Sequence, residues 1–222
     1  MKYFIISDIH GSALTLIKAL AQFKAMDCEF LVFLGDILTY GPRNSIPEGL
    51  NPKKVVEMLN PLAGRIIAVR GNCDAEVDQM ILDFPCMADY ALVVDNGKKL
   101  FFTHGHIYNE ENMPKGDWNV MFYGHTHLWK LENVDGMIIC NSGSITFPKQ
   151  GNLPTFVVYD SGVISVYSLD GELLKNIDLN QLYSRFHFYN IYHSIVAFCI
   201  FRKAIFQGIS AFEERISMAI DI

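Results

Sequence analysis

The sequence predicts an α/β protein, a four-layer α/β/β/α sandwich of two mixed sheets flanked by helices, plus a helical C-terminal extension. Three observations support this fold class. In the first part of the chain, apolar runs typical of buried strands alternate with amphipathic segments. In the middle, strand-like segments joined by tight turns dominate. Short polar motifs lie at or near the ends of the strand-like runs, where an α/β sheet binds its ligands.

The first part of the chain has the pattern strand–helix–strand–helix–strand. Tyr3–Ser7 is a continuous apolar run, the kind of strand that is buried on both faces. From Gly11 to about Met26 apolar residues recur at helical spacing, which predicts an amphipathic helix. Further strands are expected at residues 30–34 and 65–69, with a helix near residues 53–60.

Closely spaced strands distinguish the middle of the chain. Asp95-Asn96-Gly97 is a strong hairpin signal between expected strands at residues 90–94 and 99–103. Because strands outnumber helices here, we expect a second, mostly antiparallel or mixed sheet. Its further strands and the remaining strands of the chain are expected at residues 120–123, 137–140, 155–159 and 163–168.

Two parts are predicted, a domain over residues 1–181 and an apolar, helical extension over residues 182–222. Residues 186–201 of the extension contain no Asp, Glu, Lys or Arg, but they include the polar His187 and His193. A membrane-spanning helix needs about 20 predominantly apolar residues. We therefore favour a helical hairpin that packs on the domain or on a partner subunit, as in a homo-oligomer, over a membrane contact.

Composition excludes some classes of function. The net charge is −6 and the chain has no basic run, which argues against binding a nucleic-acid polymer but not a nucleotide-sized substrate. Five scattered cysteines without a Cys-x-x-Cys pair indicate reduced thiols and a cytoplasmic protein. The first apolar run ends at Asp8, too early for the core of a signal peptide.

Five polar motifs bring together the side chains that carry chemistry. They combine two carboxylates, an amide oxygen and at least four imidazoles, which is a ligand set for two divalent metal ions. Imidazoles suit Mn, Fe, Zn or Ni better than Ca, and the lack of cysteine ligands argues against structural zinc. The motifs are, in order, Asp8-Ile9-His10, Gly35-Asp36, Gly71-Asn72-Cys73-Asp74, His104-Gly105-His106 and Gly124-His125-Thr126-His127.

In this order the motifs resemble the signature of the calcineurin-like metallophosphoesterases, over about residues 1–180. Cys73, Gly105-His106 and the Gly41-Pro42-Arg43-Asn44 segment resemble a subgroup of small bacterial phosphodiesterases. The resemblance implies an α/β/β/α sandwich and two divalent ions, with Mn²⁺ favoured and Fe, Ni or Zn as alternatives. It also implies the ligand set: Asp8, His10 and His127 on the first metal, Asn72, His104 and His125 on the second, and Asp36 bridging both.

The function implied is hydrolysis of small phosphodiesters by a hydroxide activated between the two metals. One alternative is a phosphomonoesterase or nucleotide pyrophosphatase on the same centre. A non-enzymatic alternative is an interaction scaffold, because a retromer subunit that shares this fold acts through protein contacts. Against the scaffold, every metal position in this sequence holds a competent ligand.

Four further residues have open roles. Larger members of the family carry His where this chain has Cys73, and a thiol is a poorer proton donor, so we expect modest turnover and a preference for leaving groups that need little protonation. The resemblance to the subgroup of small phosphodiesterases likewise implies diesters over monoesters. His106 is expected either to contact substrate or to complete a loop. Arg43 is a candidate phosphate contact or an ordinary loop arginine. Asp74 is predicted to cap a helix that begins at Ala75.

Overall fold

The structure is a computed structural model, and it describes residues 1–182. Its contacts group Met1–Asp178 into one compact unit and assign the chain from Leu179 onward to a second. The predicted extension lies outside the described residues except for its first residue, so its helices and its boundary remain predictions. Within residues 1–182 no helix has the length and apolar character needed to cross a membrane.

The first sheet is mixed. Strands β1, β2 and β3 are parallel, whereas β9 and β10 continue the sheet in antiparallel fashion, in the order β11-β10-β9-β1-β2-β3. The register places Tyr3 of β1 opposite Phe30 of β2. Its strands are β1 (Lys2–Ile6), β2 (Phe30–Phe33), β3 (Ile66–Ala68), β9 (Thr155–Asp160), β10 (Val163–Ser168) and β11 (Leu173–Asp178).

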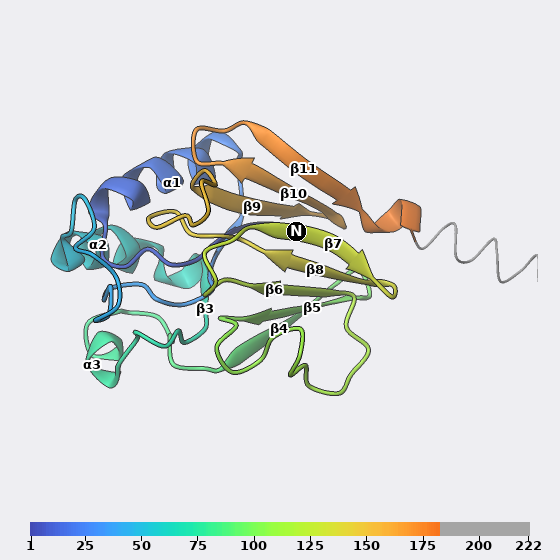
Figure 1. Cartoon of the computed structure of the whole chain (residues 1–222), viewed down its shortest axis with the longest axis horizontal. Helices are drawn as coiled ribbons and strands as arrows, with labels where there is room; N and C mark the ends of the chain where they lie inside the picture. The colour runs from blue at the N-terminus through green and yellow to red at the C-terminus, as the bar shows by residue number, and fades with distance from the viewer. Residues whose placement is uncertain (183–222) are drawn as a thin grey trace, which may run out of the picture. The chain divides into compact units, whose positions relative to one another are not determined.

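The second sheet is also mixed, with the order β4-β5-β6-β8-β7 (Figure 1). Its three inner strands are parallel and its two edge strands are antiparallel to their neighbours. The strands are β4 (Tyr90–Asp95), β5 (Lys98–Thr103), β6 (Val120–Tyr123), β7 (Lys130–Val134) and β8 (Met137–Asn141). The predicted hairpin is β4–β5, and the fold class of two mixed sheets with few helices is confirmed.

Helices cover the outer face of the first sheet. Helix α1 (Ala13–Ala25) begins two residues later than predicted, because the Ser12 hydroxyl caps it by accepting from the Thr15 N–H. It buries Leu16 and Phe23 in the same core as Phe4 of β1. The remaining helical elements are α2 (Pro52–Leu59), the 3₁₀ segment η1 (Asn60–Arg65) and α3 (Glu76–Gln79).

Aromatic rings fill the layer between the two sheets. Tyr3 of β1 packs on Phe102 of β5 at a ring-centroid distance of 6.5 Å, and Phe122 of β6 meets Tyr159 of β9 at 6.4 Å. Alternate residues of each strand therefore pack against the opposite sheet. Burying several aromatic side chains in one layer fixes the two sheets relative to each other, and with them the loops at their ends.

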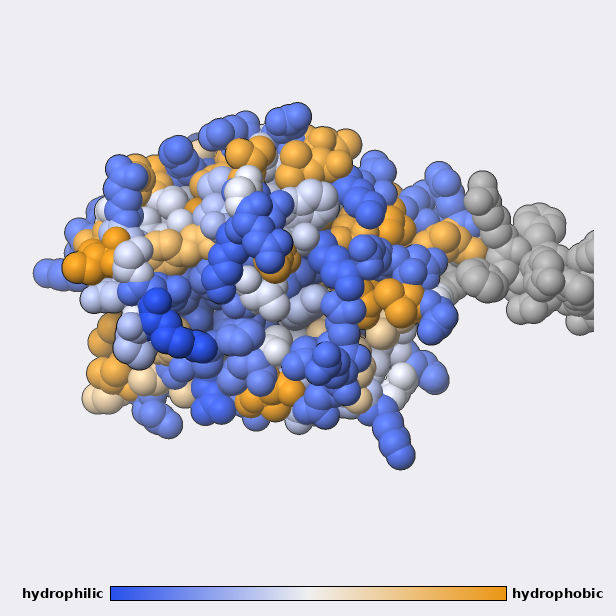
Figure 2. Space-filling view, in the orientation of Figure 1, coloured by the Kyte–Doolittle hydropathy of each residue, from blue (hydrophilic) through white to orange (hydrophobic). Residues whose placement is uncertain are grey.

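The outer face of the second sheet is covered by an irregular segment, residues 104–119. Trp118 and Tyr108 of this segment pack on an apolar cluster that includes Phe101. Glu110 anchors it, accepting from the Tyr123 hydroxyl (2.6 Å) and from the Lys130 ammonium (2.8 and 3.0 Å). In Figure 2, the visible face of the molecule is mostly hydrophilic, with hydrophobic side chains in separate groups.

Two strands were missed by the sequence analysis. β7 alternates one buried apolar residue, Leu131, with charged neighbours, so its apolar run is too short to predict a strand. β11 is half-buried at most, and Lys175 and Asn176 interrupt its pattern. Both are the last strand at one edge of their sheets, where solvent exposure weakens the alternation that reveals inner strands.

Candidate metal centre

The five polar motifs lie together at one edge of the two sheets. Backbone hydrogen bonds join their loops: the Asp8 N–H donates to the Gly35 carbonyl (3.2 Å), and the His10 N–H donates to the Asp36 carbonyl (2.9 Å). The Gly124 N–H likewise donates to the His104 carbonyl (2.9 Å). The loops are thus bonded to each other through their main chains, which fixes where the side chains can point.

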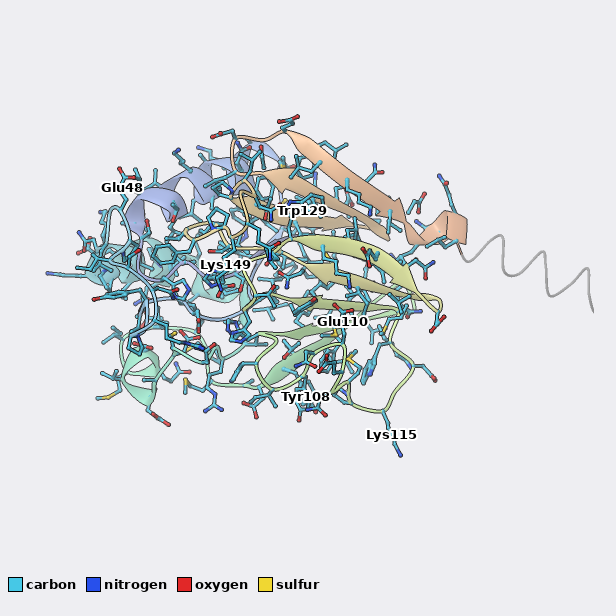
Figure 3. The ribbon with its side chains drawn as sticks, viewed as in Figure 1. Glu48, Tyr108, Glu110, Lys115, Trp129 and Lys149 are labelled. Carbon is cyan, nitrogen blue, oxygen red and sulfur yellow. The ribbon has the colours of Figure 1, made fainter. Side chains whose placement is uncertain are left out.

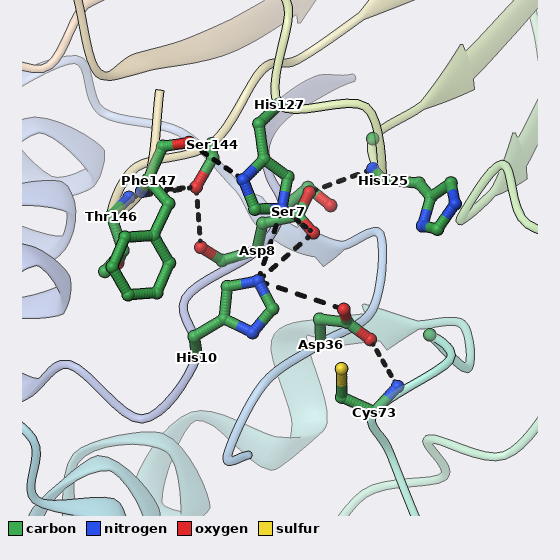
Figure 4. A network of polar contacts seen from close by, with 12 residues as sticks. Ser7, Asp8, His10, Asp36, Cys73, His125, His127, Ser144, Thr146 and Phe147 are labelled. Carbon is green, nitrogen blue, oxygen red and sulfur yellow. Dashed lines mark hydrogen bonds and ion pairs between the residues drawn. The ribbon is translucent and has the colours of Figure 1, made fainter. Parts of the chain in front are cut away.

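A first group of donors consists of Asp8, His10 and His127, all at most 4% exposed (Figure 4). The Nε2 atoms of the two rings lie 3.3 Å apart. The Asp8 Oδ1 atom lies 3.1 Å from His127 Nε2 and 3.6 Å from His10 Nε2. Each residue offers one donor atom, and the three atoms lie within 4.8 Å of one another. This is the close, mixed N/O arrangement that a divalent cation needs.

A second group consists of Asn72, His104 and His125. His104 Nε2 lies 3.1 Å from the Asn72 Oδ1 atom and 3.2 Å from His125 Nδ1. His104 is fully buried, His125 is half-buried and Asn72 is exposed. The second group is therefore open to solvent on one side, whereas the first is not.

Asp36 lies between the two groups. Its Oδ2 atom is 3.9 Å from His10 Nε2 in the first group and 3.6 Å from His104 Nε2 in the second. Its Oδ1 atom accepts from the Cys73 N–H (2.8 Å), which orients the carboxylate. One carboxylate near the donors of both groups is the position that a bridging ligand requires.

The imidazoles are oriented by backbone carbonyls. The Nδ1 atoms of His10, His104 and His127 lie 3.0, 2.6 and 2.8 Å from the carbonyl oxygens of Thr39, Leu34 and Phe147. Because a carbonyl can only accept, each Nδ1 carries the proton, and Nε2 of the neutral ring keeps its lone pair. The three lone pairs point into the cluster, and metal-binding histidines in proteins usually donate their other ring N–H to a carbonyl or carboxylate in this way.

The protonation of the first group fits a cation site. Burial by itself raises the pKa of Asp8, but the His10 and His127 rings beside it hold that pKa well below the usual range. Burial lowers the pKa of His10, but Asp8 outweighs burial and raises it. Asp8 Oδ1 has no hydrogen-bond partner in the described structure, although it is buried. These residues fit a divalent ion, which would displace the imidazole proton.

Five of the seven predicted ligands have a left-handed backbone. Asp8, His10, Asp36, His125 and His127 have φ between 52° and 64°. Non-glycine residues adopt this region rarely, at a cost on the order of 1–3 kcal/mol each. Such conformations persist where surrounding contacts determine the backbone, and they cluster at functional sites. The strain is concentrated here on the residues with donor side chains.

Asp74 has a different role from the one predicted. Helix α3 begins after Ala75, whose N–H is bound by Asp78, so the prediction that Asp74 caps this helix is wrong. The Asp74 carboxylate instead accepts from the N–H groups of Asp36, Ile37 and Gly71 at 2.7–2.8 Å. It fastens the Asp36 loop to the Asn72 loop. Nothing in the local sequence around Asp74 indicates these long-range partners.

The remaining predicted residues lie beside the cluster. Cys73 and Arg43 line a cleft of about 820 Å³ together with Asp36, Asn72, His125 and His127. Burial and the neighbouring Asp36 raise the pKa of the Cys73 thiol to about 12. His106 packs on His104 at a ring-centroid distance of 5.2 Å, and burial together with His104 lowers its pKa to about 4. Its buried Nδ1 atom has no partner within the described structure.

The sequence analysis missed Lys149, which also lines the cleft. It lies in an irregular segment between β8 and β9, outside all five motifs. Pro148 before it and Gly151 after it indicate a loop, but nothing in the sequence places that loop near the histidines. The link is a hydrogen bond from the Lys149 N–H to the His127 carbonyl (3.2 Å).

Comparison with known proteins agrees with this geometry. A family model described as the calcineurin-like phosphoesterase superfamily domain matches residues 1–162. The chain belongs to this superfamily. The phosphodiesterase YfcE of Escherichia coli K12 is 44% identical over 182 residues, which cover 81% of this chain and 99% of the relative. The phosphodiesterase MJ0936 of Methanocaldococcus jannaschii is 28% identical over 169 residues, which cover 72% and 93% of the two chains.

Among solved structures, that of the E. coli phosphoesterase Yfce is similar with a TM-score of 0.78 and 44% identity. The match covers 81% of this chain and 100% of the chain in the E. coli structure. The resemblance to calcineurin-like metallophosphoesterases that the motifs indicated is thereby confirmed, and the family implies divalent metal ions.

Proposed function

We propose that this metallophosphoesterase is a phosphodiesterase that hydrolyses small diesters with two divalent metal ions, Mn²⁺ being favoured. The observation that carries the proposal is the position of Asp36. Its carboxylate lies near His10 of the first donor group and near His104 of the second. Two relatives that bear the name phosphodiesterase support the choice of reaction. The proposal includes the roles of the seven ligands.

When bound, the two ions would lower the pKa of an attacking water and stabilise negative charge on the phosphate oxygens. The protein's own contribution is to hold the donors in place. Asp8, His10 and His127 would hold the first ion, Asn72, His104 and His125 the second, and Asp36 both. Asn72 contributes a neutral oxygen, so the ligand set holds two carboxylates only and leaves positive charge for an anionic substrate.

Proton donation to the leaving group is weak at this site. The Cys73 thiol has its pKa raised to about 12 and holds its proton at neutral pH, and His106, with its pKa lowered to about 4, carries none to give as an imidazolium. His106 and Arg43 are proposed as substrate contacts rather than acids. We therefore expect esters with good leaving groups to react fastest. The names of the two relatives support diesters over monoesters.

The test compares bis(p-nitrophenyl) phosphate with p-nitrophenyl phosphate, using metal-stripped protein with and without Mn²⁺. We expect Mn-dependent turnover that is faster on the diester and abolished by Asp36→Ala. Asp117→Ala, at a fully exposed carboxylate remote from the cluster, is the matched control and should keep wild-type activity. Faster turnover of the monoester would show a phosphomonoesterase. No turnover with any divalent ion would favour the scaffold.

The compartment and assembly are part of the same proposal. Cys28, Cys73, Cys86 and Cys140 are free thiols, and Cys199 lies outside the described residues. Free thiols support a reducing, cytoplasmic location. A homo-oligomer formed through the extension remains a prediction from the sequence.

A further inference from the structure

The cleft beside the donor cluster is larger than a small diester needs. Its volume is about 820 Å³, near the upper part of the roughly 300–1,000 Å³ range of small-molecule sites. Tyr40 provides an aromatic wall, and Arg43 and Lys149 provide two positive charges. Asp36 is the single carboxylate among the described lining residues, and it is one of the proposed metal ligands. The outer part of the cleft therefore carries cations without balancing anions.

Arg43 lines the cleft together with Asn72 and His125 of the second donor group. The loop that carries it is closed by the Asn44 side chain, which donates to the Tyr40 carbonyl (2.7 Å). Arg65 donates to backbone carbonyls and Arg70 pairs with Asp89, whereas the Arg43 guanidinium forms no hydrogen bond or ion pair with the described residues.

Lys149 lies on the side of the first donor group, through the bond from its N–H to the His127 carbonyl. Its own carbonyl accepts from the backbone and the side chain of Asn152 (3.1 and 2.9 Å), so the backbone is held at both polar groups. The ammonium forms no ion pair within the described part of the chain. Figure 3 shows Lys149 beyond the end of β8, whereas Lys115 projects into solvent from the segment over the second sheet.

Arg43 and Lys149 both line this cleft, and neither forms an ion pair with the described residues, although the chain has a net charge of −6. A diester carries one negative charge, which the two metal ions are placed to neutralise. Further cations in the outer cleft contribute most to binding when the substrate brings further negative charge. Arginine and lysine are the usual partners of phosphate groups in proteins.

We propose that the substrates are phosphodiesters that carry a second phosphate group beyond the scissile one, and that Arg43 and Lys149 select them by binding that second phosphate. This inference rests on the proposed phosphodiesterase function and narrows its substrate class. A nucleotide diester with a terminal phosphate has a suitable size and charge. The scissile phosphate belongs to the metal cluster, and the second phosphate belongs to the outer cleft.

The test uses two substrates with the same scissile bond and leaving group. These are thymidine 5′-(p-nitrophenyl phosphate) and its derivative with a 3′-phosphate. Wild-type protein should prefer the 3′-phosphorylated substrate by about 100-fold in kcat/KM, the effect of two charge-assisted hydrogen bonds that contribute about tenfold each. Arg43→Gln and Lys149→Gln should each lose about tenfold more on that substrate than on the other, through KM. Lys115→Gln is the matched control and should retain the preference.

A binding measurement separates this inference from the proposed activity. Calorimetry with thymidine 3′,5′-bisphosphate and thymidine 5′-phosphate should show tighter binding of the bisphosphate, and Arg43→Gln and Lys149→Gln should each reduce the difference about tenfold. If wild-type protein hydrolyses neither substrate but keeps this binding preference, the phosphodiesterase proposal fails and the cleft assignment stands. The inference would be overturned if wild-type protein bound the two thymidine phosphates equally and hydrolysed the two p-nitrophenyl esters at equal rates. It would also be overturned if each variant lost kcat/KM equally on both esters.

Discussion

The two halves of the donor cluster differ in burial although they contain similar side chains. Asp8, His10 and His127 are 0–4% exposed and lie beneath other protein atoms, whereas Asn72 is exposed and His125 half-buried. Buried donors are held by the surrounding fold, and exposed donors must be ordered when a metal binds. We infer that the first half is pre-formed and binds its ion more tightly, and that the second half faces the cleft and substrate.

The loops explain the difference. Hydrogen bonds from backbone and hydroxyl groups hold the loops of the first half, including one from the Ser144 hydroxyl to the Asp8 carbonyl (2.9 Å). In the second half, the Asp74 carboxylate joins the Asn72 loop to the Asp36 loop by accepting from the N–H groups of Gly71 and Asp36. Gly71 lies so close to Asp36 that an added Cβ would collide with its carboxylate. Both halves are therefore fixed through their loops, but Asn72 and His125 of the second half reach the cleft surface.

The largest expected effect is a loss of activity, and it should differ between a substitution in the first half and one in the second. His10→Ala should lower kcat by about 1,000-fold or more, because several kcal/mol of metal stabilisation correspond to that factor. Asn72→Ala should lower activity strongly at micromolar Mn²⁺ but recover much of it at millimolar Mn²⁺, because it weakens a site that other ligands still form. Rates measured against Mn²⁺ concentration check both. Equal rescue of the two variants would contradict the asymmetry.

A smaller effect is expected from Asp74→Asn, which keeps the size of the side chain but cannot accept all three N–H groups equally well. Loss of such an orienting partner typically costs about 10–100-fold in metal affinity. We expect this loss at the second half of the cluster, seen as a higher Mn²⁺ concentration for half-maximal activity. Asp78→Asn is the control, because Asp78 binds the Ala75 N–H away from the donors. An unchanged Mn²⁺ requirement for Asp74→Asn would exclude a positioning role.

The smallest effect concerns pH. The pKa of His10 is raised, so its proton competes with metal up to a higher pH than that of an ordinary histidine, whereas the pKa of His125 is lowered and its ring is already neutral. Affinity of the first half should therefore fall by up to about tenfold per pH unit below the His10 pKa. The second half should respond less in the same range. Calorimetric Mn²⁺ titrations between pH 8 and pH 6 measure both.

Much of the fold could be predicted because inner strands have long apolar runs. Tyr3–Ser7 and residues 99–103 are recognisable without any knowledge of their partners. Edge strand β7 is not, because Glu132 and Asn133 face solvent. The cover of the second sheet by residues 104–119 was not predicted either, because Tyr108 and Trp118 pack irregularly and lack a helical period.

The donor cluster could be predicted because each proposed ligand lies in a short motif after a strand. Asp74 and Lys149 could not, for a physical reason. Asp74 acts on N–H groups of Ile37 and Asp36, which are far away in the sequence, and Lys149 reaches the cleft through a bond to the His127 backbone. Such contacts depend on how loops meet in space. From residue type alone, an aspartate before a short helix is interpreted as a helix cap, and a lysine in a loop is interpreted as an exposed surface charge.

The most direct test of the central claim is a titration of metal-free protein with Mn²⁺ in which bound metal and hydrolysis of bis(p-nitrophenyl) phosphate are measured on the same samples. The account predicts two bound ions per chain, the first bound more tightly, with turnover rising as the second is taken up. His10→Ala should lose the tight step, and Asn72→Ala should weaken the second. Full turnover with a single ion bound, or two ions bound without any turnover, would contradict a two-metal phosphodiesterase.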